Sequence, residues 1–89
     1  MYSQSFKFCL VFTSKAQKQI DALSLKDRKQ YDKAFQNLAE SGPSYRSLRT
    51  HRYHHKGCDI WGSSASMAKR FYWYYKAEKI IAITNLDSH

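Results

Sequence analysis

The chain has 89 residues, and 15 Lys or Arg against 7 Asp or Glu give a formal net charge of +8. This length supports one small domain with a modest core and excludes a large substrate pocket. Hydrophobic residues make up 43% and aromatic residues 16%, which excludes a disordered basic tail and predicts a folded protein. The first residues lack the pattern of a signal peptide, and no apolar run reaches membrane-spanning length. We therefore expect a cytoplasmic protein without a membrane partner.

The N-terminal part predicts a strand and a first helix. Apolar residues alternate from Phe6 to Phe12, which is the period of a strand with one face on a core. Ser14 and Gln17 fit a capping box, which predicts a short helix that ends near Leu23.

A second helix is predicted from Ser24, which with Asp27 repeats the start signal, to Gly42-Pro43, which supplies the stop. One stripe of this helix is apolar and its other faces are charged or polar, so one side is expected to pack on a core. The stripe consists of Tyr31, Ala34, Phe35 and Leu38.

After Pro43 the period returns to two residues. Four strands are predicted, at Ser47–Tyr53, Asp59–Ser64, Lys69–Lys76 and Lys79–Leu86. The order β-α-α-β-β-β-β predicts an α+β fold, in which both helices pack on one face of a mostly antiparallel sheet. The other face stays open, and we expect the functional site there.

The stretch from Tyr45 to Lys76 holds seven Lys or Arg but only one acid, Asp59, together with eight aromatic residues. Such a surface concentrates phosphates, and exposed rings can stack on unpaired bases. If Phe71, Trp73 and Tyr75 point to the helices, the residues that alternate with them point to the open face, namely Arg70, Tyr72, Tyr74 and Lys76. If Leu48 points inward on the strand Ser47–Tyr53, the outward residues of that strand are Arg49, His51 and Tyr53, and the two outward sets converge on the open face. The residues predicted to bind RNA are Arg49, Arg52, His55, Lys56, Lys69, Tyr72, Tyr74 and Lys76.

All four histidines lie in the same half of the chain as these arginines. RNA cleavage without a metal needs a base for the 2′-hydroxyl, an acid for the 5′-oxygen and cationic donors for the phosphorane. Histidine suits the first two tasks and arginine the third, so Arg70, His51 and His54 are catalytic candidates. Adjacent histidines and two isolated cysteines make a poor ligand set, so we expect no metal or cofactor.

The chain begins with a predicted strand and two predicted helices. They are followed by Arg70 within Lys-Arg-Phe-Tyr-Trp-Tyr-Tyr, the run Lys79–Thr84 and the last residue, His89. This combination resembles the RelE/ParE toxin superfamily. The resemblance implies that residues 1–89 form a single RelE-like toxin domain. It implies a type II toxin that cleaves mRNA in the ribosomal A site and is silenced by an acidic antitoxin within a hetero-oligomer.

The resemblance also assigns roles to residues. It implies that Arg70 stabilises the scissile phosphate and that His89 is an acid or base following the last strand. Histidines on the second strand or the loop after it match His51, His54 and His55, whereas Gly62 stands where an acidic residue is expected.

Three alternatives stay open. A ParE-like protein would poison DNA gyrase and needs no histidine acid/base set. A nuclease-dead relative would bind only an antitoxin or nucleic acid. An ordinary RNA-binding module requires neither the terminal histidine nor the helical pair.

Overall fold

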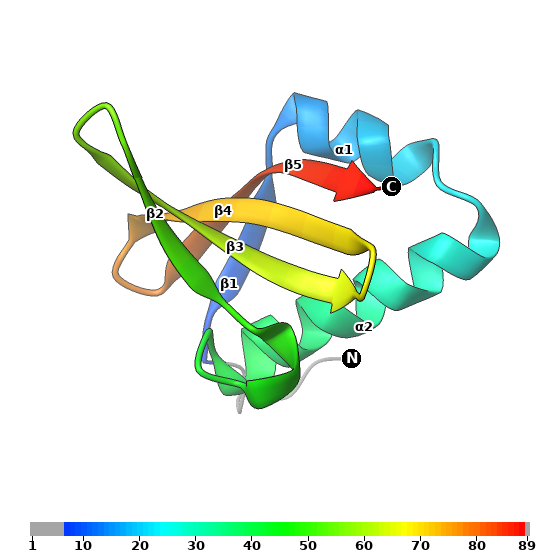
Figure 1. Ribbon diagram of the computed structural model, residues 1–89, viewed down its shortest axis with the longest axis horizontal. Helices are drawn as coiled ribbons and strands as arrows, with labels where there is room; N and C mark the ends of the chain where they lie inside the picture. Colours follow the sequence, from blue (N-terminus) through cyan, green and yellow to red (C-terminus); the bar gives the residue numbers. More distant parts are fainter. Residues whose placement is uncertain (1–6, 89) are drawn as a thin grey trace.

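The computed structural model describes residues 7–88, apart from the side chains of His55 and Ser88. Within this range the helices are α1 (Ser14–Asp21), α2 (Leu25–Ser41) and a short 3-10 helix, η1 (Arg46–Leu48). The strands are β1 (Cys9–Phe12), β2 (His51–His55), β3 (Cys58–Ser66), β4 (Lys69–Ala77) and β5 (Ile80–Ser88). The predicted order of strands and α-helices is therefore confirmed (Figure 1).

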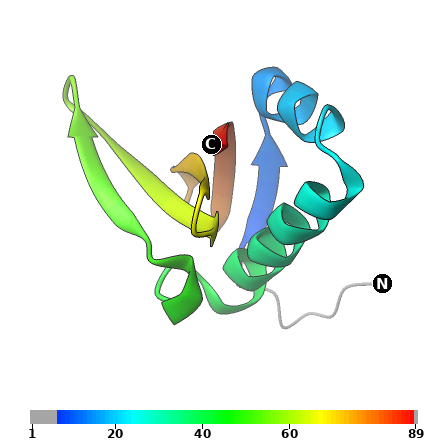
Figure 2. The ribbon, with the colours of Figure 1, turned by 45° about the vertical axis from the view of Figure 1, so that its right-hand side comes forward.

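The strands form one sheet in the order β1-β5-β4-β3-β2. Strand β1 runs parallel to β5 and the other neighbours are antiparallel, so the sheet is mostly antiparallel, as predicted. Both helices lie on the same side of this sheet, and the tip of the β2–β3 hairpin extends away from them (Figure 2). No helix among residues 7–88 is long and apolar enough to span a membrane.

The side of the sheet that faces away from the helices is called the open face below. Its residues follow from the pairing of the strands, because directly paired residues point to the same face. The open face contains His51, Tyr53, Gly62, Ser64, Arg70, Tyr72, Asn85 and Asp87.

The core lies between the helices and the other face of the sheet. Tyr31 and Leu38 of α2 and Phe71 and Trp73 of β4 are completely buried in it. The rings of Phe35 and Phe71 pack edge to face with centroids 4.9 Å apart. This packing fixes which face of β4 points inward, so its alternate residues are directed to the open face.

The two helix starts differ in how well the sequence predicted them. Ser24 caps α2 as predicted, because its hydroxyl accepts a hydrogen bond from the Asp27 amide at 3.2 Å. The prediction of Ser14 as the cap of α1 was wrong, since Thr13 accepts from the Ala16 amide at 3.1 Å. The Thr13 hydroxyl also donates to the Thr84 carbonyl at 2.9 Å, a contact with β5 that favours it as the cap.

The predicted start of the second strand at Ser47 was also wrong. Ser47 lies in η1, and β2 begins only at His51. The turn of η1 places Leu48 in the core, and Arg49 ends it in the left-handed conformation with φ of 47°. A strand cannot pass through such a residue, because its backbone is not extended. At its other end β2 runs two residues further than predicted, to His55.

Candidate nucleic-acid interface

One row of residues crosses the open face from β2 to β5. His51 pairs with Gly62, Gly62 with Tyr72, and Tyr72 with Asn85. The ring of Tyr53 reaches across Gly62 to Tyr72, and the two centroids lie 6.2 Å apart. The predicted convergence of outward residues from the second strand and the aromatic strand is therefore seen at this pair.

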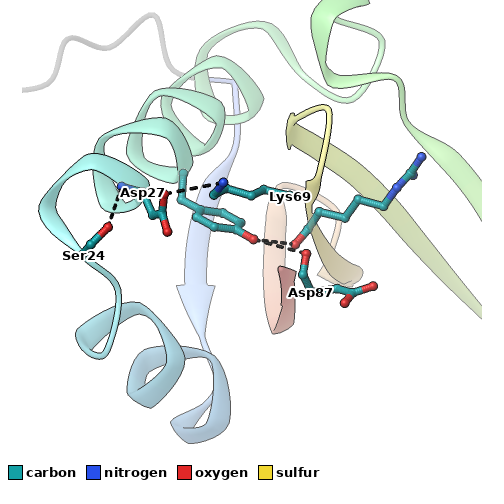
Figure 3. A network of polar contacts seen from close by, with 6 residues as sticks. Ser24, Asp27, Lys69 and Asp87 are labelled. Atoms are coloured by element: carbon teal, nitrogen blue, oxygen red, sulfur yellow. Dashed lines mark hydrogen bonds and ion pairs between the residues drawn. The ribbon is translucent and has the colours of Figure 1, made fainter. Parts of the chain in front are cut away.

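The backbone of Arg70 is fixed from the helix side of the sheet. The buried hydroxyl of Tyr31 donates to the carbonyls of Arg70, at 3.1 Å, and Asp87, at 3.4 Å, which are paired residues on β4 and β5 (Figure 3). Beside it, the Lys69 ammonium lies 3.5 Å from the Asp27 carboxylate in the first turn of α2. The hydrogen bonds of Tyr31 therefore hold the backbone of Arg70 in position.

The guanidinium of Arg70 has an unused donor. Its Nη1 is buried, and no hydrogen-bond partner lies within reach among the described residues. Arg70 lines a pocket of 290 Å³ together with a second arginine, three serines and a methionine, namely Arg49, Ser47, Ser64, Ser66 and Met67. An anion that entered this pocket would meet two guanidinium groups and supply the missing acceptor.

The pKa of Tyr72 is raised by some of its neighbours on the open face and lowered by another. Burial raises the pKa of Tyr72, and the nearby negative charge of Asp87 and the ionisable hydroxyl of Tyr53 raise it further, whereas Arg70 lowers it. The hydroxyl donates to Asp87 Oδ2 at 3.4 Å. Tyr72 therefore stays protonated at neutral pH and offers a neutral ring beside the arginine pocket.

The fold is shared with several bacterial and archaeal toxins of known structure. RelE from the RelE-RelB complex of Pyrococcus horikoshii OT3 superposes with a TM-score of 0.74 at 12% identity, covering 92% of this chain and 94% of that one. A chain of the YoeB dimer of Staphylococcus aureus superposes with a TM-score of 0.73 at 10% identity, covering 93% of this chain and 98% of that one. A chain of the Escherichia coli DinJ-YafQ toxin-antitoxin complex superposes with a TM-score of 0.72 at 7% identity. The match covers 93% of this chain and 93% of that one.

This chain has the fold of the RelE/ParE toxin superfamily. By sequence alone, no protein-family model and no curated protein matches it. The likeness lies in the arrangement of helices and strands, and the RelE-like fold accounts for the open face described above.

Several predicted site residues lie outside the open face of this RelE-like sheet. Lys69 points to α2 and pairs with Asp27. Arg52 pairs with Trp61, whose ring stacks on Trp73 on the helix side. His54 follows Tyr53 and therefore points to the opposite face of β2, where its Nδ1 lies 3.1 Å from Asp59 Oδ1.

The remaining predicted residues lie around the edges of the site. Tyr74 is exposed, and alternation places it beside Tyr72 on the open face. Lys76 lies where β4 shifts its register against β5. Lys56 forms the tip of the β2–β3 hairpin with Gly57, both with positive φ. His55 belongs to β2, but its side chain is among those not described, and His89 lies outside the described residues.

Two open-face residues were not predicted to act in the site, although Tyr53 was predicted to face outward. The first is Tyr53, which is 43% exposed and contacts Tyr72. The second is Gly62, which is buried beneath both rings. A glycine inside a strand was the available signal, since it commonly marks a close approach of other groups.

The described residues contain no cluster of side chains that could bind a metal ion. Among residues 7–88, excluding the two side chains named above, no three His, Cys, Asp or Glu side chains lie close enough together to bind one. Cys9 and Cys58 are exposed free thiols on different strands.

Proposed function

We propose that this protein is the toxin of a type II toxin-antitoxin system and that it cleaves mRNA on the ribosome. The observation that carries the proposal is the pocket lined by Arg49 and Arg70, in which one donor of Arg70 has no hydrogen-bond partner among the described residues. A phosphodiester oxygen supplies the acceptor that Nη1 of Arg70 lacks. The shared fold with RelE, YoeB and YafQ toxins supports the same assignment.

In this proposal the 2′-hydroxyl oxygen of the substrate attacks the adjacent phosphorus. A base removes the proton from that hydroxyl, and an acid protonates the 5′-oxygen as its bond to phosphorus breaks. The products are a 2′,3′-cyclic phosphate and a free 5′-hydroxyl. Arg70 binds the non-bridging oxygens, whose negative charge grows in the phosphorane transition state.

His51 is the histidine on β2 that we propose as one acid or base. It is exposed on the open face in the same row as Gly62 and Tyr72, whereas His54 points to the opposite face. His89 remains the proposed partner in proton transfer, as the sequence resemblance implies. Histidine can serve in either role because its ordinary pKa lies near neutrality.

We further propose an acidic antitoxin as the partner that silences the toxin in a hetero-oligomer. The chain carries a net charge of +8, which favours an acidic partner. RelE and YafQ, which share the fold, were solved in complexes with RelB and DinJ. Co-expression with the product of an adjacent small gene should restore growth and yield a stable complex. Harmless expression of the protein without such a neighbour would contradict this part of the proposal.

The nuclease proposal is tested in a reconstituted translation system in which mRNA cuts are mapped by primer extension. Wild-type protein should cut mRNA when ribosomes are present and much less when they are omitted, because the ribosome positions the substrate. His51→Ala should slow cleavage by about 10²- to 10⁴-fold. His54→Ala is the matched control on the opposite face of β2 and should change the rate far less.

A further inference from the structure

Tyr53 and Tyr72 form a compact aromatic pair at the centre of the open face. Their ring planes meet at 63° with centroids 6.2 Å apart, which is an edge-to-face arrangement. Tyr53 is 43% exposed, while Tyr72 is partly buried by its neighbours. The pair lies between His51, in the same row, and Arg70, two residues before Tyr72 on the same face of β4.

Gly62 is what allows the two rings to lie so close to the sheet. A Cβ atom on this residue would lie 2.9 Å from Cε2 of Tyr53 and 3.0 Å from Cε1 of Tyr72. Any larger residue would therefore have to push both rings outward. A glycine within a strand weakens the strand, so its presence here indicates that the position of the rings matters.

We propose that Tyr53 and Tyr72, supported by Gly62, form a stacking site for one unpaired base of single-stranded RNA. The assignment of RNA as the ligand rests on the proposed function. Residues two apart on one face of a strand are separated by about 7 Å, a distance that the ribose of one nucleotide bridges. A phosphate bound by Arg70 thus brings an adjoining base to the tyrosine pair.

The chemistry of the site indicates what it recognises. Every base has a π-face, so stacking on tyrosine tolerates all four bases. In the proposed site Arg49 and Arg70 bind the phosphate, and the tyrosines bind the base without reading its identity. Paired bases are excluded, because both faces of a base in a duplex are already covered by its neighbours.

The proposal is tested by NMR titration of the ¹⁵N-labelled protein with the RNA trinucleotide ApApA and with the same trinucleotide lacking its central base. Wild-type protein should bind ApApA more tightly, with the largest shifts at Tyr53, Gly62 and Tyr72. Tyr53→Ala should weaken binding of ApApA about fivefold to a hundredfold and abolish the preference for the intact base. Tyr53→Phe should retain it, because the ring is preserved.

The matched control is Tyr75→Ala. Tyr75 is 40% exposed and contacts the rings of Trp61 and Trp73, but on the opposite face of the sheet. Its removal should leave the preference for the intact base unchanged, provided that the thermal unfolding curve shows a folded protein.

Gly62→Ala gives a second, independent test that keeps both tyrosines. Its Cβ should displace the rings and lower the preference for the intact base, although the net charge and the arginines are unchanged. Equal binding of the two trinucleotides by wild-type protein, or no detectable binding of either, would overturn the stacking site.

These results are separable from the test of the nuclease. Base-dependent binding by a protein that leaves mRNA intact on ribosomes would support the stacking site and contradict the proposed function. Ribosome-dependent cleavage with equal binding of the two trinucleotides would support the proposed function and contradict the stacking site.

Discussion

On the open face, several neighbouring groups shift the pKa of Tyr72. Burial, the negative charge of Asp87 and the ionisable hydroxyl of Tyr53 all raise its pKa, while Arg70 lowers it. The net direction is upward, so the folded protein holds the phenolic proton more tightly than the unfolded chain does. The hydroxyl also donates to Asp87 across β4 and β5, which keeps the ring in its place above Gly62.

This shift predicts a pH dependence that Tyr72→Phe should reduce. A raised pKa in the folded state stabilises the protein below the ordinary tyrosine pKa of about 10, and that contribution is lost as the pH rises through the folded-state value. The free energy of unfolding in urea should therefore fall more between about pH 8 and pH 10.5 in the wild type than in the variant. Equal slopes would contradict the shift. Tyr75, whose pKa burial also raises, is present in both proteins and cancels.

At the scale of the elements, a buried polar contact joins the start of β2 to β3 and β4. The indole N–H of Trp73 donates to the hydroxyl of Ser63 at 3.0 Å, and that hydroxyl shares a hydrogen bond of 2.8 Å with Thr50. Ser63 is completely buried. These contacts hold together the strands that carry the open face.

Ser63→Ala should therefore destabilise the protein. It leaves the buried N–H of Trp73 without its acceptor, which costs about 1–3 kcal/mol. Ser66→Ala is the control, because Ser66 lies at the end of the same strand and is partly exposed. Urea unfolding followed by tryptophan fluorescence measures both, and a loss no larger in Ser63→Ala than in the control would contradict the role of this contact.

The same scale shows how much of the fold the sequence could predict. The apolar stripe of α2 and the alternation in β4 identified elements that long periodic patterns define. The cap of α1 and the start of β2 were wrong, because Thr13 is favoured by a contact with β5, and η1 ends at a left-handed arginine. Neither the distant contact nor the backbone conformation leaves a signal in local periodicity.

Only part of the candidate site could be predicted, because local alternation does not show which residues become neighbours when the strands pair. Alternation correctly placed Arg70 and Tyr72 on one face, but charge alone also selected Lys69, which pairs with Asp27 on the helix side. Gly62 was noted only as a departure from a family pattern. Its contacts with Tyr53 and Tyr72 appear only once three strands are paired.

At the scale of the whole molecule, the positive charge predicts binding that depends on salt. Neutralising a phosphate of single-stranded RNA releases counterions, and each such contact contributes about 0.7 to the slope of log affinity against log salt concentration. Arg70→Ala should reduce that slope by about this amount in titrations with a short RNA. Lys69→Ala removes the same charge from the other face and should leave the slope nearly unchanged. Identical slopes for the two variants would show that net charge alone governs binding.

The central claim is that Arg70 stabilises the transition state of mRNA cleavage, and the most direct test compares two neighbouring residues of β4. The measurement is the rate of ribosome-dependent mRNA cleavage by the wild type, Arg70→Ala and Lys69→Ala at saturating enzyme. We predict that Arg70→Ala is slowed by about 10²- to 10³-fold and that Lys69→Ala, once shown to be folded, is close to the wild type. Equal rates for Arg70→Ala and the wild type, or intact mRNA with the folded wild-type protein, would contradict the account.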